Sequence, residues 1–354
     1  MKIISIVGAR PQFIKAAVVN RAIQLHDDME NVLVHTGQHY DTNMSSLFFS
    51  ELNISAPDYN LEVGSGSHGR QTGIMLEKIE KVLISEQPDW VIVYGDTNTT
   101  IAGALSAAKL HQRIVHIEAG LRSFNRHMPE EINRIVTDHI SSLLFAPTKT
   151  AMENLNKEGL GDRSIFSGDV MFDSAIYYAD MVENHSDKFQ KFVPPFYLAT
   201  VHRQENTDDK KKLANIFDAF KQLKRQIVLP LHPRTKKQIG LYKIEIPSNV
   251  QVIEPVGYLN IIYLLKNCEK VLTDSGGLQK EAYFLRKPCI SLRDETEWIE
   301  TLKGNWNILA GTDVDKILNS VQEKNYSDQD RAFGQGNAGE IIVNSLLKNK
   351  DLPL

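Results

Sequence analysis

Short apolar runs rich in β-branched residues alternate with amphipathic windows along the whole chain. Such runs are typical of strands buried on both faces of a parallel sheet, and the windows between them are typical of crossover helices. Strands are predicted at residues 2–7, 31–36, 89–95, 113–119, 143–148 and 164–169, and again at 197–202, 227–232, 250–255, 270–275, 288–293 and 306–311. Helices are expected between them, for example at 11–25, 70–86, 98–111, 129–142 and 149–158.

The two series of strands predict an α/β protein with two doubly wound domains. The polar segment 185–195 is the best candidate for a linker, although the helix expected at 170–184 could belong to either half. The stretch 333–349 is Gly-rich and then amphipathic, and we expect it to dock on the first domain. The predicted domains are an N-terminal Rossmann-like domain of residues 1–169 plus 334–354 and a C-terminal Rossmann-like domain of residues 170–333.

Composition narrows the choice of partner. The chain has 354 residues, with 40 Lys and Arg against 44 Asp and Glu, and a net charge of −4. Because binding to a phosphate backbone needs a basic excess, nucleic acid is not expected. Cys268 and Cys289 are the only cysteines, which excludes a disulfide framework and favours the reducing cytoplasm. No apolar stretch approaches the ~20 residues of a membrane helix, so no membrane insertion is expected.

The turn after the first predicted strand reads GARPQFIK, residues 8–15. A Gly-Ala turn with Pro early in the helix leaves helix N–H groups free to attract an anion, and Arg10 and Lys15 add positive charge. Neither the dinucleotide fingerprint GxGxxG nor a P-loop occurs here, so the sequence lacks the motifs that usually indicate an NAD or ATP site. A helix cap with solvated charges is the alternative interpretation of this turn.

The segment TDSGGLQKEA, residues 273–282, predicts a second anion site at a strand-to-helix turn. Paired glycines let the backbone approach a diphosphate, and the helix N-terminus supplies donors. Ser275, Gly276 and Gly277 would lie at this turn, and Glu281 one helical turn later could accept hydrogen bonds from ribose hydroxyls. A plain tight connection is the alternative. Two such anion sites suggest a nucleotide diphosphate as the ligand.

Carboxylates gather near the strand ends of the first half: Asp96, Glu118 and Glu130, with Arg134 four residues after Glu130. An acid and a base in one enclosed site can have their pKa values pushed apart, as removal and return of a proton require. Taken singly, Asp96 could be a helix N-cap, and Glu130 with Arg134 an ordinary ion pair. Their clustering favours a catalytic role.

Histidines also follow strands. His202 and His232 stand directly after predicted strands of the second half, where each could contact a phosphate or exchange a proton; a buried structural histidine is the alternative. His116 and Glu118 have the HxE spacing of zinc deaminases, but Cys289 lacks the second cysteine that completes such a site. No metal is therefore expected.

From residue 3 to about residue 311, the chain resembles the non-hydrolysing UDP-N-acetylglucosamine 2-epimerases. The resemblance is carried, in this order, by GARPQFIK, HTGQHYD, YGDTNTT, HIEAGLRS, PEEINR, HRQEN, HPR, TDSGGLQKEA and RDETEW. It implies a GT-B fold with the active site in the cleft between two Rossmann-like domains, a homodimer, and neither cofactor nor metal. It also implies that UDP-GlcNAc and UDP-ManNAc are interconverted, for cell-surface polysaccharide synthesis, by elimination of UDP to a 2-acetamidoglucal and its re-addition.

The resemblance implies roles for individual residues. Asp96, Glu118 and Glu130 match the catalytic carboxylates, without deciding which of them removes the proton from carbon 2. Some bacterial members also use UDP-GlcNAc as an allosteric activator. The remaining assignments are Arg10, Lys15 and His202 for the diphosphate and its departure, Ser275, Gly276 and Gly277 for phosphate, Glu281 for ribose, Arg134 for substrate, and Gln38, Arg70, Gln71, Arg203 and His232 at or near the activator.

Three alternatives stay open. Four motifs of this chain differ from the family's commonest forms: GARPQ, HRQEN, SGGLQKEA and RDETEW. The same set of motifs also occurs among epimerases that act on UDP-2,3-diacetamido-2,3-dideoxy-glucuronate. That substrate differs from UDP-GlcNAc in the groups on carbons 3 and 6. A GT-B glycosyltransferase would fit the second-domain turn, but it needs an acceptor and leaves carbon 2 untouched. A nucleotide-sugar sensor would bind without turnover.

Overall fold

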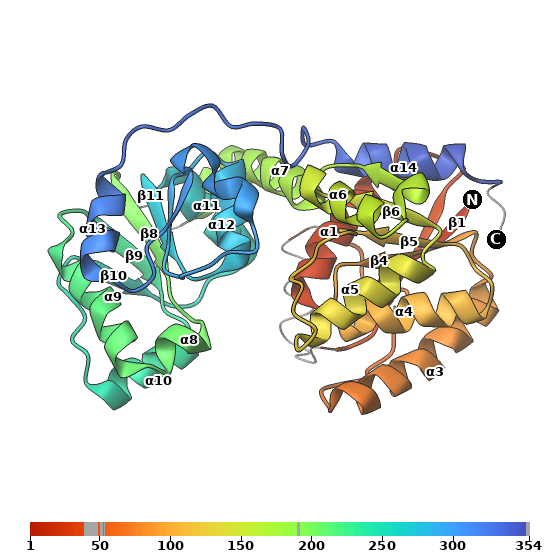
Figure 1. The fold of residues 1–354 in the computed structure, drawn as a ribbon, viewed down its shortest axis with the longest axis horizontal. Helices are drawn as coiled ribbons and strands as arrows, with labels where there is room; N and C mark the ends of the chain where they lie inside the picture. Colours follow the sequence, from red (N-terminus) through yellow and green to blue (C-terminus); the bar gives the residue numbers. More distant parts are fainter. Residues whose placement is uncertain (39–48, 50–51, 53, 190–191, 352–354) are drawn as a thin grey trace. The chain divides into compact units, whose positions relative to one another are not determined.

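The computed structural model describes residues 1–38, 49, 52, 54–189 and 192–351 (Figure 1). The chain divides into two compact units, residues 1–174 with 331–354, and residues 175–330. The division falls inside helix α7 (Val170–Asn184) and not in the segment 185–195, which the sequence marked as the linker. Both units are α/β with parallel sheets, as predicted.

The first unit is built on a seven-stranded parallel sheet in the order β3-β2-β1-β4-β5-β6-β7. The strand order reverses between β1 and β4, which is the switch point where ligands bind in sheets of this kind. The predicted strands are all present, and the sequence missed only β3, whose two residues are too short to show a pattern. The strands are β1 (Lys2–Val7), β2 (Glu30–His35), β3 (Tyr59–Asn60), β4 (Trp90–Tyr94), β5 (Ile114–Ile117), β6 (Leu143–Ala146) and β7 (Ser164–Phe166).

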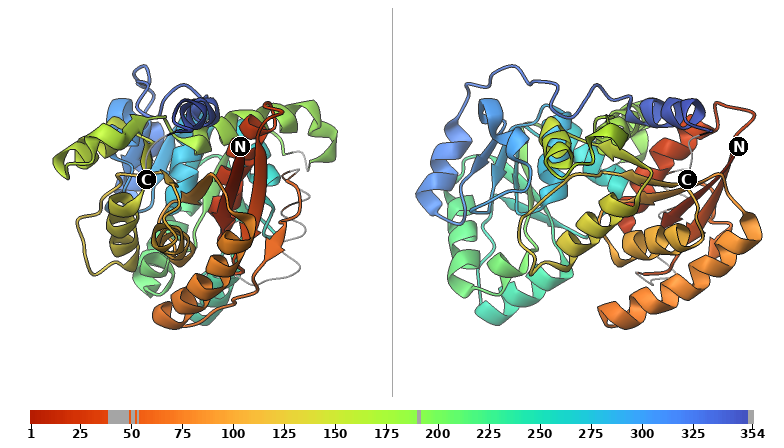
Figure 2. Two further views of the ribbon diagram at one scale, coloured as in Figure 1. Left: turned by 90° about the vertical axis from the view of Figure 1, so that its right-hand side faces the viewer. Right: turned by 45° about the vertical axis from the view of Figure 1, so that its right-hand side comes forward.

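Helices cover both faces of this sheet (Figures 1 and 2). Because side chains alternate along a strand, Ile4 and Ile6 of β1 point to one face, where they pack with residues of α3 and α4. Helix α14 packs against α1, where a Cβ on Gly339 would lie 3.0 Å from Val18 Cγ1. The helices are α1 (Arg10–Ile23), α3 (His68–Glu86), α4 (Asn98–Lys109), α5 (Pro129–Ile140), α6 (Lys149–Lys157), α14 (Ala338–Lys348) and the 3₁₀ turn η1 (Gly161–Arg163).

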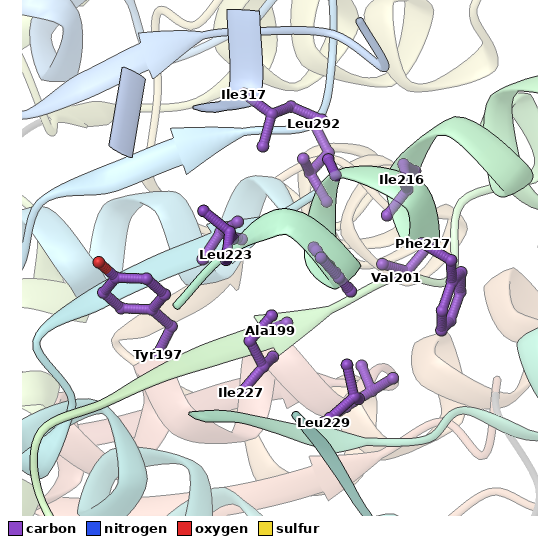
Figure 3. Packing of buried hydrophobic residues seen from close by; sticks show 14 of the residues in the cluster. Tyr197, Ala199, Val201, Ile216, Phe217, Leu223, Ile227, Leu229, Leu292 and Ile317 are labelled. Carbon is purple, nitrogen blue, oxygen red and sulfur yellow. The ribbon is translucent and has the colours of Figure 1, made fainter. Parts of the chain in front are cut away.

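The second unit has a six-stranded parallel sheet in the order β10-β9-β8-β11-β12-β13, with its switch point between β8 and β11. Tyr197, Ala199 and Val201 face a core with α9 and α13 (Figure 3), whereas Phe196 and Leu198 face α11 and α12. The strands are β8 (Phe196–Thr200), β9 (Gln226–Pro230), β10 (Val250–Ile253), β11 (Lys270–Thr273), β12 (Cys289–Ser291) and β13 (Asn307–Leu309). The helices are α8 (Gln204–Thr207), α9 (Lys210–Gln222), α10 (Pro233–Tyr242), α11 (Tyr258–Asn267), α12 (Gly276–Phe284) and α13 (Val314–Gln322), with 3₁₀ turns η2 (Ser186–Lys188) and η3 (Ile299–Asn305).

The sheets place the candidate residues. β1, β4 and β5 are neighbours in the first sheet, so the turns that follow them lie side by side. In the second sheet β8 and β11 are neighbours, which brings the turn at His202 beside the turn at Ser275. In the part of the chain that the structure describes, no helix is both long and apolar enough to cross a bilayer.

Candidate active site

Glu118 and Lys15 form an ion pair at the switch point of the first sheet. Glu118 directly follows β5 with a left-handed backbone, φ +73°, and its carboxylate pairs with Lys15 of α1. Both side chains are about nine-tenths buried, with 9% of each exposed. A Cβ on Gly95 would lie 3.3 Å from Glu118 Oε2 and 3.3 Å from Lys15 Nζ. The absence of a side chain at Gly95 therefore lets this pair approach the turn after β4.

Asp96 follows β4 and binds Arg134 of α5. Arg134 donates to Asp96 Oδ2 from Nη2 at 2.6 Å and from Nε at 3.0 Å, and Asn133 donates to the Asp96 carbonyl at 2.8 Å. The N-cap of α4 is Thr97, whose hydroxyl accepts from the backbone N–H of Thr100. Asp96 is therefore not a helix cap, and the structure brings it together with Arg134 as a charged pair.

Glu130 and Glu131 are adjacent at the start of α5 but occupy different environments. Glu130 is half-buried, and within the described residues no ion pair joins it to Arg134. Glu131 is 1% exposed and accepts hydrogen bonds from the N–H groups of Ser123 and Phe124 at 2.9 Å and from Arg134 Nη1 at 2.8 Å. Burial acts to raise the pKa of Glu131, but these hydrogen bonds hold the pKa below its ordinary value.

Gln12 closes the turn that leads into α1. The N–H groups of Gly8 and Ala9, just before the helix, donate to Gln12 Oε1 at 2.8 and 3.0 Å. Gln12 Nε2 in turn donates to the Tyr94 carbonyl at 2.7 Å, which ties α1 to the turn after β4. A Gln three residues into a helix is the sequence signal for such a cap. Arg10, at the first position of α1, is exposed.

In the second unit, His202 is held by Asp274. Asp274 is completely buried, and its carboxylate accepts from the N–H groups of His202 and Arg203 at 3.0 Å and from Asn206 Nδ2 at 3.2 Å. His202 Nδ1 lies 3.2 Å from Asp274 Oδ1, so Nε2 is the ring nitrogen that a ligand can reach. Burial acts to raise the pKa of Asp274, but His202 and these N–H groups keep the pKa below its ordinary value.

This lowered pKa predicts a pH-dependent loss of stability. The contribution of Asp274 is complete above its unfolded pKa of about 3.9 and is lost as the pH falls through the lower folded pKa. We expect D274N to reduce the free energy of unfolding at neutral pH by ~1–3 kcal/mol, and this difference from wild type to shrink below about pH 4. Urea unfolding of both proteins across this pH range measures it; a difference that does not change with pH would contradict the prediction.

His232 lies beside His202, with a ring-centroid distance of 5.6 Å. It is the N-cap of α10, and its Nδ1 accepts from the N–H of Arg234 at 3.2 Å. Burial, together with the positive charges of His202 and Arg234, lowers the pKa of His232. An acceptor at Nδ1 and a lowered pKa both favour the neutral ring.

The turn between β11 and α12 supplies backbone donors. Ser275 caps α12 by accepting from the N–H of Leu278 at 3.4 Å, and in the described structure the N–H groups of Gly276 and Gly277 have no acceptor. Glu281 is buried one turn later. The turn can therefore offer two N–H groups and a helix N-terminus to a phosphate.

Arg293 and Glu297 also lie at this turn, although the sequence assigned them no role. A Cβ on Gly276 would lie 2.9 Å from Glu297 Oε1. Glu297 pairs with Arg293 Nη1 at 2.6 Å and with Arg203 Nη2 at 3.5 Å, and Lys280 Nζ lies 3.8 Å from the centre of the Trp298 ring. These residues belong to the RDETEW segment or contact it. The difference between RDETEW and the commonest family form was the signal in the sequence that could have pointed to them.

Of the residues assigned to an activator, Gln38 and Gln71 lie together in the first unit. Gln38 Oε1 accepts from Thr99 Oγ1 at 2.8 Å, and Gln71 Oε1 accepts from Asn98 Nδ2 at 2.8 Å. Both side chains are thus bound to the first residues of α4, close in sequence to Asp96. Arg70 is exposed, and Arg203 and His232 belong to the second unit. Residues 39–41 of the HTGQHYD segment lie outside the described residues.

Within the described ranges, no group of three or more His, Cys, Asp or Glu side chains is arranged to hold a metal ion. His116, the first residue of the HxE spacing, has both ring nitrogens engaged, by Asp138 at 2.6 Å and by the Gly95 carbonyl at 2.7 Å.

Comparison with known proteins decides the family. The sequence model of the UDP-N-acetylglucosamine 2-epimerase family matches residues 21–347. The chain belongs to this family. It is 52% identical to a UDP-N-acetylglucosamine 2-epimerase homolog of Methanococcus maripaludis, over 98% of this chain and 99% of that protein. It is 48% identical to the UDP-2,3-diacetamido-2,3-dideoxy-D-glucuronate 2-epimerase of Pseudomonas aeruginosa, over 98% and 100%.

A solved structure of this epimerase family shares the fold. The Methanocaldococcus jannaschii UDP-GlcNAc 2-epimerase, in complex with UDP-GlcNAc and UDP, superposes with a TM-score of 0.86 at 44% identity, over 98% of this chain and 100% of that chain. The predicted GT-B class of two Rossmann-like domains is thereby confirmed.

Proposed function

We propose that this chain is a non-hydrolysing UDP-N-acetylglucosamine 2-epimerase, an isomerase that interconverts UDP-GlcNAc and UDP-ManNAc. The observation that carries the proposal is the pair of carboxylates, Asp96 with Arg134 and Glu118 with Lys15, at the switch point of the first unit. Membership of the epimerase family and likeness to an enzyme solved with UDP-GlcNAc support it. The first unit supplies the acid and base, and the second binds UDP.

The chemistry explains the need for several carboxylates. The proton on carbon 2 is not next to a carbonyl, so its loss must accompany the departure of UDP from the anomeric carbon. Re-addition with the opposite configuration then requires a proton on the other face of carbon 2. Asp96, Glu118 and Glu130 provide the groups that remove and return it. Arg134 and Lys15 fix the positions of two of these carboxylates.

The second unit stabilises the leaving UDP. Negative charge grows on the diphosphate as the carbon–oxygen bond breaks, and fixed donors lower the energy of that state. The N–H groups of Gly276 and Gly277 at the start of α12 are such donors, and Ser275 caps the same turn. His202, oriented by Asp274, presents Nε2 to a phosphate, and Glu281 accepts from the ribose hydroxyls.

A turnover assay in D₂O tests the reaction. UDP-GlcNAc alone, with no acceptor and no added cofactor, is expected to gain deuterium at carbon 2 while UDP-ManNAc forms, as followed by NMR. Protium retained at carbon 2 of the product would exclude elimination and re-addition. A requirement for a sugar acceptor would instead indicate a glycosyltransferase, and binding without turnover would indicate a sensor.

UDP-2,3-diacetamido-2,3-dideoxy-glucuronate is the second candidate substrate. It is favoured by the 48% identity to the P. aeruginosa enzyme and by Arg293 and Glu297 of the RDETEW segment, which lie at the start of α12. The reaction at carbon 2 would be the same. Comparing kcat/KM for the two UDP sugars decides between them. Resemblance to the family supports a homodimer and a role in cell-surface polysaccharide synthesis, and the two free cysteines, Cys268 and Cys289, support a place in the reducing cytoplasm.

A further inference from the structure

We infer that His116 and Asp138 are positioning residues that lock together the two turns bearing Asp96 and Glu118. This inference rests on the proposed function. Both residues are completely buried, so neither can touch a substrate, and any effect on the reaction must pass through the residues they contact.

His116 bridges the turn after β4 to helix α5. Its Nδ1 lies 2.6 Å from Asp138 Oδ1, and its Nε2 lies 2.7 Å from the carbonyl oxygen of Gly95, the residue before Asp96. The ring is therefore held through both of its nitrogens, one on each side. A buried ring that is held in this way has a fixed orientation, and it fixes the Gly95 carbonyl in turn.

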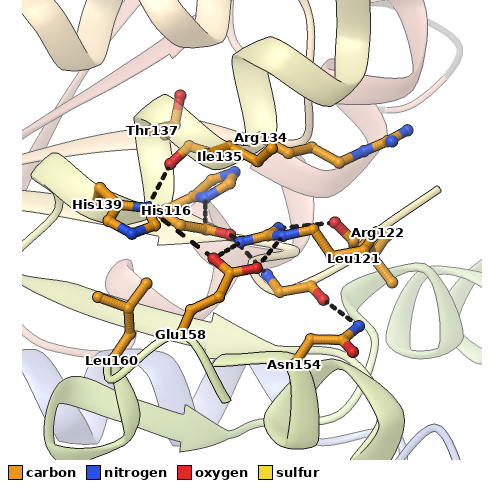
Figure 4. Close-up of polar contacts among 12 residues, drawn as sticks. His116, Leu121, Arg122, Arg134, Ile135, Thr137, His139, Asn154, Glu158 and Leu160 are labelled. Atoms are coloured by element: carbon orange, nitrogen blue, oxygen red, sulfur yellow. Dashed lines mark hydrogen bonds and ion pairs between the residues drawn. The ribbon is translucent and has the colours of Figure 1, made fainter. Parts of the chain in front are cut away.

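Asp138 extends the connection to the turn after β5. Its Oδ2 accepts from the N–H of Gly120 at 3.1 Å and lies 2.7 Å from Arg122 Nη2. Arg122 also binds Glu158 of the loop after α6, with Nε and Nη2 each 2.7 Å from a carboxylate oxygen (Figure 4). Burial acts to raise the pKa of Asp138, but the charges and hydrogen bonds of His116 and Arg122 hold the pKa below its ordinary value. Asp138 is thus an ionised anchor beneath both turns.

The backbone at both turns needs such an anchor. Gly95, Glu118 and Gly120 have φ values of +65°, +73° and +80°, and a left-handed conformation is costly for the non-glycine Glu118. Such conformations persist only where the surroundings over-determine them. His116 holds the carbonyl of Gly95, and Asp138 holds the N–H of Gly120, so one buried pair fixes the turn on each side of the Glu118 carboxylate.

Two conservative variants separate the two hydrogen bonds. In H116N, the side-chain amide nitrogen takes the position of the histidine Nδ1 and can keep the hydrogen bond to Asp138. In H116Q, the side-chain amide nitrogen takes the position of the histidine Nε2 and can keep the hydrogen bond to the Gly95 carbonyl. We expect each to lower kcat for epimerisation by about 10- to 100-fold, the effect of a displacement near 1 Å at a reacting group. KM is expected to change by less than about 3-fold and the affinity for UDP to stay unchanged, because the phosphate donors proposed at the start of α12 belong to the second unit.

S5A is the matched control, because Ser5 is also buried in the first sheet and donates to Asn31 Oδ1 at 2.9 Å. It is expected to lower stability but to keep wild-type kcat. Wild-type kcat in both His116 variants would overturn the inference, as would an equal loss in S5A. If wild type exchanges deuterium at carbon 2 of neither UDP sugar, the proposed function fails. In that case, crystal structures of the variants test the positioning role separately. The Gly95 carbonyl and the Glu118 carboxylate are expected to move by more than about 0.5 Å in a His116 variant and not in S5A. If these groups do not move in the His116 variants, the inference is overturned.

Discussion

Replacing Glu118 by Gln, or Asp96 by Asn, is expected to lower kcat about 10²- to 10⁴-fold, the usual contribution of a positioned general acid or base. Each amide keeps the shape and part of the hydrogen bonding of the carboxylate but cannot accept or return a proton. The affinity for UDP should stay within about 2-fold of wild type, because the proposed UDP donors belong to the second unit. Epimerisation followed by NMR, with UDP titrated by calorimetry, measures both quantities.

The control for these variants is E77Q. Glu77 is an exposed carboxylate of the same unit that pairs with Lys81 within α3, and losing an exposed pair of this kind has little effect on stability. E77Q should therefore match wild type in kcat. If E118Q and D96N both keep more than about a tenth of wild-type kcat, the assignment of acid–base chemistry to the first unit is wrong.

Replacing Glu131 by Ala is expected to lower the free energy of unfolding by about 3–5 kcal/mol, as for breaking a buried pair by removing one partner. Its carboxylate binds two N–H groups of the loop before α5 and one side of Arg134. Without it these donors lose their acceptor, and Arg134 loses a support that helps it hold Asp96. Chemical unfolding measures the stability, and kcat is expected to fall with it.

The adjacent residue is the matched comparison. E130Q should leave the free energy of unfolding within about 0.5 kcal/mol of wild type, because Glu130 is only half-buried, while kcat falls. The two neighbours would then separate a structural carboxylate from a catalytic one. Equal stability losses in E131A and E130Q would contradict this division.

The strands and helices were predictable because strands in parallel sheets carry continuous apolar runs, and the motifs sit at their ends. The capping role of Gln12 could also be predicted, because Gln12 is the third residue of α1. By contrast, Asp274 with His202 and Asp138 with His116 are pairs made by strand order and helix packing, and nothing in the local pattern joins them.

The distinction between Glu130 and Glu131 shows the same limit. Both stand in the first turn of α5, and their environments differ because packing rotates the helix so that Glu131 faces the loop at Ser123. A sequence shows the spacing of residues on a helix, but the rotation of that helix against its neighbours depends on the tertiary structure. The left-handed backbone of Glu118 likewise follows from contacts around it.

The packing of α14 against α1 has a consequence for biosynthesis. Because the first unit needs residues from Arg331 onward, its α1 face stays uncovered on the ribosome until the entire second unit has been translated. The second unit, a continuous segment, can complete its fold earlier. The face of α1 that packs against α14 is thus made early but covered late, and a ribosome that stalls before residue 331 leaves an incomplete first unit as a substrate for chaperones and proteases.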